Sequence, residues 1–95
     1  MQNNTIPKEK DWFRDGISRA HYVRRAGMEL VTGLGQGVQE QNLKDDARTQ
    51  LVECILNITK SVNDEYEEQM KKLEQEWHYT DQTFQQFVES VELTI

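Results

Sequence analysis

The sequence has one proline, one cysteine and no long apolar run. Because Pro7 is the only proline, no proline interrupts helix formation in the rest of the chain. The single cysteine, Cys54, excludes a disulfide within the chain and a four-cysteine zinc site, and it suits a reducing compartment. We find no secretory leader, and no apolar segment approaches the ~20 residues of a membrane span. These absences predict a cytoplasmic protein that does not enter the membrane.

The sequence also lacks a motif for catalysis or metal binding. The segment 33–37 has glycine at alternate positions, but it follows a helical pattern and no lysine closes it, so it does not form a phosphate-binding loop. His21 and His78 would lie far apart in a helical hairpin, and neither belongs to a spaced metal-ligand pair. Cys54 lies on a helix flank beside apolar residues, which indicates packing. We therefore expect no enzyme activity, no cofactor and no metal site.

What remains is typical of long amphipathic helices. Apolar residues make up 36% of the 95 residues and charged residues 29%, a lean apolar fraction that fits helices burying one stripe each. The apolar spacing predicts a single all-α domain, namely an antiparallel hairpin of two long helices followed by a short C-terminal helix. The predicted segments are a flexible start over 1–6, helices over about 8–34, 43–78 and 81–92, and a glycine-rich loop over about 35–42.

Local signals set these boundaries. Gly33, Gly35 and Gly37 favour a helix end, because glycine readily adopts the left-handed conformation of a C-cap. Asn42 is suited to cap the second helix, with an acidic residue three positions later in the capping-box position. Thr80 is suited to cap the third helix.

Small residues form a line on the apolar face of the first helix. At ~100° per residue, Gly16, Ala20 and Gly27 lie nearly above one another. Each glycine costs about 1 kcal/mol relative to alanine within a helix, so this line predicts close packing against another helix. The resulting groove allows two interpretations: a site that Tyr66 or a tryptophan fills, and a slot for a ligand.

Charge is divided unevenly along the chain. Residues 1–25 carry six basic and three acidic residues, whereas the whole chain has a net charge of −6. On the helical wheel four polar residues form one basic stripe away from the glycine line: Arg14, Ser18, His21 and Arg25. Arg24 lies at the edge of the apolar face, where we expect it to reach a carboxylate in a buried ion pair.

The basic stripe allows three interpretations: a solvated or salt-bridged face, a contact for a protein partner, or a site for an anionic ligand. The net negative charge argues against nucleic acid. A two-helix hairpin leaves apolar surface open, so we expect a homo-oligomer, a dimer or higher, that closes a helical bundle. The leading hypothesis is a small interaction protein with a protein partner: an adaptor, inhibitor or regulatory subunit. The alternative is an oligomeric binder or sequestering protein for a small anionic ligand such as a nucleotide.

Overall fold

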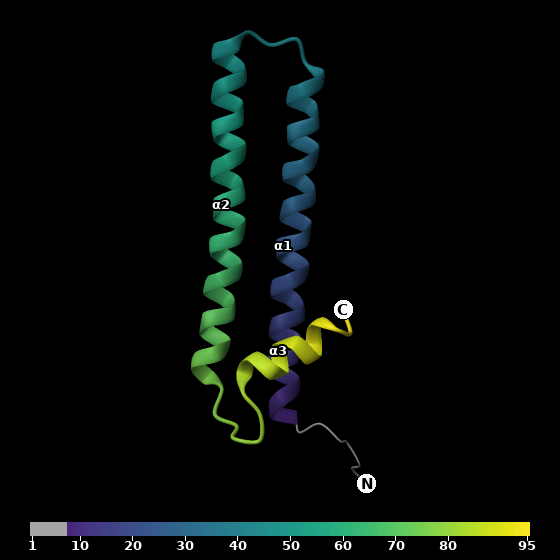
Figure 1. The fold of residues 1–95 in the computed structure, drawn as a ribbon, viewed down its shortest axis with the longest axis vertical. Coiled ribbons are helices and arrows are strands. Elements are labelled where there is room, and N and C mark those ends of the chain that lie inside the picture. The colour runs from purple at the N-terminus through teal and green to yellow at the C-terminus, as the bar shows by residue number, and fades with distance from the viewer. Residues whose placement is uncertain (1–7) are drawn as a thin grey trace.

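Two long antiparallel helices and a short third helix make up residues 8–95, the part of the chain that the computed structural model describes (Figure 1). The helices are α1 (Lys8–Glu40), α2 (Asp45–Glu76) and α3 (Phe84–Glu92). The structure measures 65 × 24 × 17 Å, and α3 crosses α1 at the end of the hairpin away from the connection. The all-helical prediction of a hairpin with a short third helix is confirmed, while the flexible start predicted over 1–6 lies outside the described residues.

The glycine-rich loop predicted over 35–42 is wrong for most of its length, because α1 continues to Glu40. Its glycines are helical, and no described glycine has a positive φ. Val31 and Val38 continue the helical spacing across this segment and are half-buried. The Gln41 N–H still bonds to the Gly37 carbonyl at 3.1 Å. Packing of the flanking valines therefore offsets the low helix propensity of glycine, and only residues 41–44 connect the two helices.

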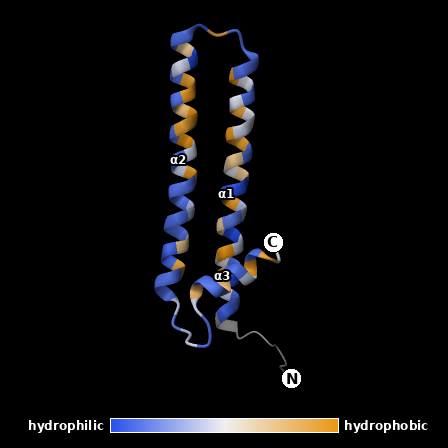
Figure 2. Ribbon diagram, in the orientation of Figure 1, coloured by the Kyte–Doolittle hydropathy of each residue, from blue (hydrophilic) through white to orange (hydrophobic). Residues whose placement is uncertain are grey.

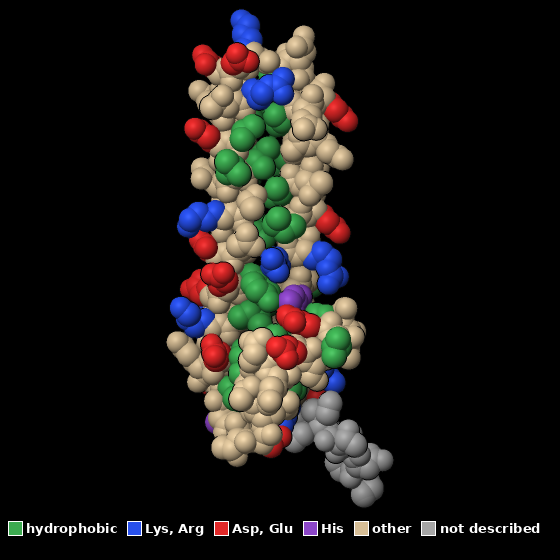
Figure 3. Space-filling view, viewed as in Figure 1, with side chains coloured by type: hydrophobic (Ala, Val, Ile, Leu, Met, Phe, Trp, Pro, Cys, Tyr) green, Lys and Arg blue, Asp and Glu red, His purple; other side chains and the backbone are tan. Residues whose placement is uncertain are grey.

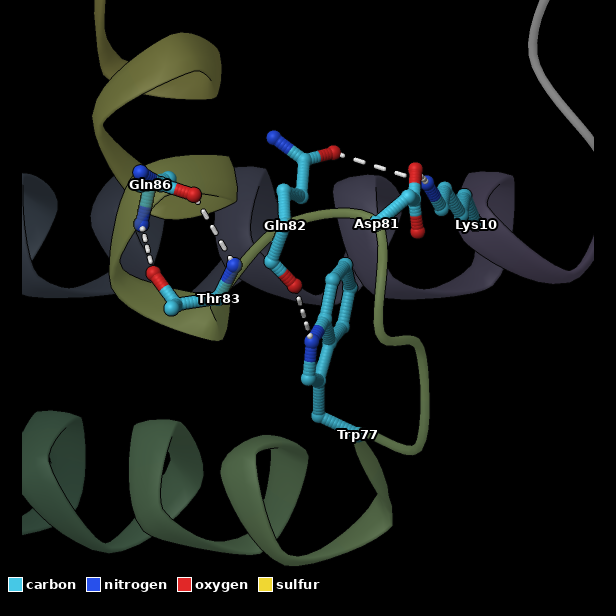
Figure 4. A network of polar contacts seen from close by, with 6 residues as sticks. All are labelled: Lys10, Trp77, Asp81, Gln82, Thr83 and Gln86. Atoms are coloured by element: carbon cyan, nitrogen blue, oxygen red, sulfur yellow. Dashed lines mark hydrogen bonds and ion pairs between the residues drawn. The ribbon is translucent and has the colours of Figure 1, made fainter.

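The predicted helix starts also differ from those observed. Helix α2 is preceded by Lys44, which makes no side-chain cap, so Asn42 does not cap it. Helix α3 begins three residues later than predicted and is capped by Thr83, not Thr80. The Thr83 hydroxyl accepts from the Gln86 N–H at 3.0 Å, and the Gln86 side chain accepts from the Thr83 N–H at 3.0 Å (Figure 4). This reciprocal pair satisfies two backbone donors that the first turn would leave open.

The segment between α2 and α3 is held by side chains that keep it out of a helix. Helix α2 ends at Glu76, two residues before the predicted end. The Trp77 indole N–H then donates to the Gln82 carbonyl at 3.1 Å, and Lys10 of α1 bonds to Asp81 at 2.6 Å (Figure 4). These contacts fix the turn that returns the chain to α1.

The hydrophobic core lies at the α3 end of the hairpin. Ile17 is fully buried at its centre. The other members come from all three helices: Phe13, Leu73, Phe84, Phe87, Val88 and Val91. Trp77 packs its ring against Phe13 and Phe84, with centroids 5.1 and 5.6 Å apart. Rings bury large apolar areas, so this end accounts for most of the buried side chains.

The other end of the hairpin has no such cover. We call residues 23–66 the loop half and the remaining described residues the α3 half. In the loop half, apolar residues recur along the facing flanks of α1 and α2 (Figure 2), yet many of their side chains are exposed. The exposed ones are Val23, Leu30, Leu34, Leu51, Val52, Leu56 and Ile58. Two helices alone cannot cover both sides of the seam, the line along which α1 and α2 pack together.

Candidate functional site

A groove of about 830 Å³ runs between α1 and α2. Its apolar lining comes from both long helices: Trp12, Gly16, Ala20, Val23, Gly27, Ile58, Val62, Tyr66 and Leu73. Charged and polar residues join them: Asp15, Arg19, Arg24, Asn57, Ser61, Glu65 and Gln69. No residue of α3 lines the groove, because α3 packs on the Phe13 and Ile17 side of α1.

The two glycines of the predicted small-residue line are contact points between the helices. A Cβ atom on Gly16 would lie 2.8 Å from a Leu73 methyl, and one on Gly27 would lie 2.9 Å from a Val62 methyl. Ala20, between them, is 6% exposed. Close packing therefore occurs where the small residues predicted it. The residues opposite the glycines are Leu73 and Val62, whereas the expected Tyr66 lines the groove beside them.

Arg24 does not form the predicted buried ion pair. It is exposed, and its Nε donates to the Asn63 side-chain oxygen at 3.3 Å. Its guanidinium also lies over the Tyr66 ring, 4.9 Å from the centroid. Because water still reaches Arg24, its charge does not require a carboxylate partner. The Asn63 side-chain oxygen and the face of the Tyr66 ring are sufficient partners for the guanidinium.

The residues of the predicted basic stripe have different surroundings. Arg14 lies 3.1 Å from the Asp11 carboxylate, one turn earlier on α1. His21 contacts Glu92 of α3 at 3.1 Å and the Tyr66 hydroxyl at 3.2 Å. Ser18 is half-buried and Arg25 is exposed. Two members of the stripe thus already face carboxylates of the same chain, and Arg25 is the one member of the four that is classed as exposed.

His21, Tyr66 and Glu92 join the three helices at the boundary between the two halves. The His21 and Tyr66 rings meet edge to face, with centroids 5.1 Å apart. Burial raises the pKa of the Tyr66 hydroxyl, and the Glu92 carboxylate raises it further, while Arg24 acts in the opposite direction. Tyr66 therefore stays protonated at neutral pH and can donate a hydrogen bond.

Lys10 makes buried contacts that the sequence did not predict. It is 7% exposed, and its ammonium lies 4.9 Å from the Tyr79 ring centroid as well as beside Asp81. That hydrogen bond from Lys10 is the main reason why the pKa of the Asp81 carboxyl is lowered. The partner lies 71 positions away, so no spacing pattern could have revealed the pair.

The described residues offer little for other kinds of site. Within 8–95, no group of three histidine, cysteine, aspartate or glutamate residues could hold a metal ion. None of the described helices is long and apolar enough to cross a membrane. Cys54 is exposed, so it does not contribute to packing as predicted.

The face shown in Figure 3 carries a second apolar region. Apolar side chains follow the seam between α1 and α2 in the loop half, and charged side chains lie along its outer edges. Comparison with protein-family models, with curated proteins and with solved structures finds no match to this chain. Any functional conclusion therefore depends on the groove and the exposed seam themselves.

Proposed function

We propose that the protein is a small, non-enzymatic interaction protein that acts through its helical surfaces as an oligomer. The observation that carries the proposal is the groove between α1 and α2, which no residue of α3 covers. Its walls are apolar and its edges are charged, which is the composition of surfaces that bind other helices. An adaptor, an inhibitor or a regulatory subunit would use such a surface in the same way.

The exposed apolar side chains of the loop half support association further. Leu30 and Leu51, which lie on the helix faces that line the groove, are 63% and 42% exposed. Single exposed leucines are ordinary, but a row of them that continues an apolar groove is typical of an interaction surface. Covering them against another helical surface would remove this apolar area from water.

The alternative function, an oligomeric binder for a small anionic ligand such as a nucleotide, is less well supported. It requires the basic stripe to be free to donate to phosphate oxygens. Arg14 and His21 already lie against Asp11 and Glu92, and a phosphate would have to displace both carboxylates.

Sedimentation equilibrium at low micromolar concentration tests the proposal. We expect the wild type to sediment at a multiple of its chain mass of 11.2 kDa. Val23→Glu places a charge in the groove and should shift the protein toward the monomer. Leu93→Glu makes the same kind of change at a residue that is 88% exposed outside the groove, and it should leave the mass unchanged. A folded wild-type monomer would contradict the proposal.

A further inference from the structure

We propose that the groove is occupied by the groove of a second copy of this chain, with the two hairpins parallel and related by a two-fold axis along the helices. The inference rests on the proposed function and specifies its partner. In this dimer α1 of each copy lies on α2 of the other, which forms a four-helix bundle with one α3 on each outer side. Three features of the groove support this arrangement.

First, the apolar surface does not end with the groove. Leu30 lies seven residues after Val23 on α1, and Leu51 lies seven residues before Ile58 on α2, so each pair shares one helix face. Leu30 and Leu51 are 63% and 42% exposed. A short bound segment would cover the groove alone, whereas a second parallel hairpin would also cover this continuation into the loop half.

Second, the charges along the groove are complementary in the parallel arrangement. Gly16 faces Leu73 and Gly27 faces Val62, and these contacts define which residues of α1 and α2 are level. Asp15 is then within two residues, about 3 Å, of the level of Lys72. Arg19 is within five residues, about 8 Å, of the level of Glu65, a separation that two long side chains can span.

These four residues belong to the surface that would meet the second copy. Asp15, Arg19 and Glu65 line the groove, and Lys72 is an exposed residue seven positions after Glu65, on the same helix face. Arg19 takes part in none of the ion pairs among residues 8–95. Placing α1 on the partner's α2 therefore brings Asp15 near the level of the partner's Lys72 and Arg19 within reach of the partner's Glu65, with Lys72 lying two residues from the level of Arg19 as well.

Third, the antiparallel arrangement brings like charges together. The groove extends over residues 12–27 of α1 and 57–73 of α2. A two-fold axis that is perpendicular to the helices and passes through the middle of the groove would place Arg19 near Arg19 of the second copy. It would likewise place Glu65 near Glu65 of the second copy. It would also leave both loop halves projecting without cover. The parallel axis avoids both problems.

Charge reversal tests the pairing directly. Arg19→Glu and Glu65→Lys should each raise the dimer dissociation constant about tenfold at low salt, because each homodimer contains the repulsive contact twice. An equimolar mixture of the two variants should regain dimerisation, with the heterodimer predominating in native mass spectrometry. The double variant should dimerise with itself. Arg25→Glu and Glu67→Lys, which make the same charge changes at exposed residues outside the groove, should behave as wild type.

A disulfide tests the parallel direction independently of charge. Gly33 lies eighteen residues after Asp15, and Cys54 lies eighteen residues before Lys72. Eighteen residues are five full helical turns, so Gly33 lies on the same face of α1 as Asp15, and Cys54 lies on the same face of α2 as Lys72. Gly33 and the partner's Cys54 are therefore separated along the helix axis by the same distance as Asp15 and the partner's Lys72. A Cβ atom on Gly33 meets no other atom within 4 Å. Gly33→Cys should therefore form a disulfide with the partner's native cysteine under mild oxidation, visible as a dimer on a non-reducing gel.

The controls separate this proposal from the broader one. Wild type, with its single cysteine, and Thr32→Cys, on another side of α1, should give no such dimer. A wild-type dimer that tolerates both charge reversals and does not crosslink through Gly33→Cys would overturn the arrangement while leaving the proposed function intact. A folded wild-type monomer would overturn both, and it would leave the groove to a helix of another protein.

Discussion

The α3 half and the loop half are built from the same two helices, but they differ in what covers them. In the α3 half, α3 and the turn before it cover Phe13, Ile17 and Leu73, which are at most 7% exposed. In the loop half, α1 and α2 have only each other. Helix length is therefore no guide to burial in this protein, because each apolar side chain is enclosed only where a third element reaches it.

Shortening one apolar side chain in each half should give the largest difference between the two halves in the free energy of unfolding. Ile17→Ala removes fully buried atoms and should lower the free energy of unfolding by about 2–5 kcal/mol. Leu30→Ala should change the unfolding of the monomer by less than about 0.5 kcal/mol, because its side chain is mostly in water. Urea denaturation followed by circular dichroism measures both changes.

Protein concentration extends this comparison. The loss from Ile17→Ala should be the same at every concentration, because its contacts lie within one chain. The loss from Leu30→Ala should grow with concentration if a second copy covers the loop half. If Leu30→Ala lowered the free energy of unfolding of the monomer as much as Ile17→Ala does, the loop half would be enclosed within one chain.

Substitutions at two glycines of α1 should change the stability of the protein in opposite directions. Gly27→Leu should destabilise by about 1–3 kcal/mol, because its Cβ would already lie 2.9 Å from Val62 and the rest of the side chain needs more room. Gly33→Ala meets no neighbour and should stabilise by up to about 1 kcal/mol through helix propensity. Thermal unfolding of both variants measures the difference. Stabilisation by Gly27→Leu would mean that the two helices do not approach closely at this point.

These glycines also show how far the sequence could predict the fold. The spacing of apolar residues predicted three helices, and the line of Gly16 and Gly27 predicted a close contact, since both patterns are local to one helix. The identity of the opposite residues depended on the relative position of two helices, which spacing within one helix does not contain. Leu73 and Val62 therefore took the place expected for Tyr66.

The errors have the same origin. Gly35 and Gly37 looked like a helix end because glycine favours one, but the packing of Val31 and Val38 against the hairpin decided otherwise. The end of α2 and the role of Lys10 depend on a contact across 71 residues. The sequence indicated the groove through its small residues, whereas its charged edges became visible only when two helices were placed side by side.

The smallest expected difference in stability is between two lysine–aspartate pairs, one in each half. In the α3 half, Asp81 pairs with the buried Lys10, and in the loop half Asp64 pairs with Lys60 at 2.9 Å with both side chains exposed. Pairs between exposed side chains contribute little to stability because water and salt screen them. We therefore expect Asp81→Asn to lower the thermal midpoint at pH 6 more than Asp64→Asn does.

The effect of pH distinguishes a charge effect from lost packing. The hydrogen bond from Lys10 holds the pKa of the Asp81 carboxyl below its ordinary value of 3.8. The charged carboxylate therefore stabilises the fold above about pH 4, and this contribution is lost as the pH falls through the lowered pKa of the folded state. At still lower pH, Asp81 is neutral in both folded and unfolded chains, so wild type and Asp81→Asn should converge. Thermal midpoints from pH 6 to pH 2 test this, and a difference that persists undiminished at pH 2 would show that the carboxylate charge is not what fixes the turn.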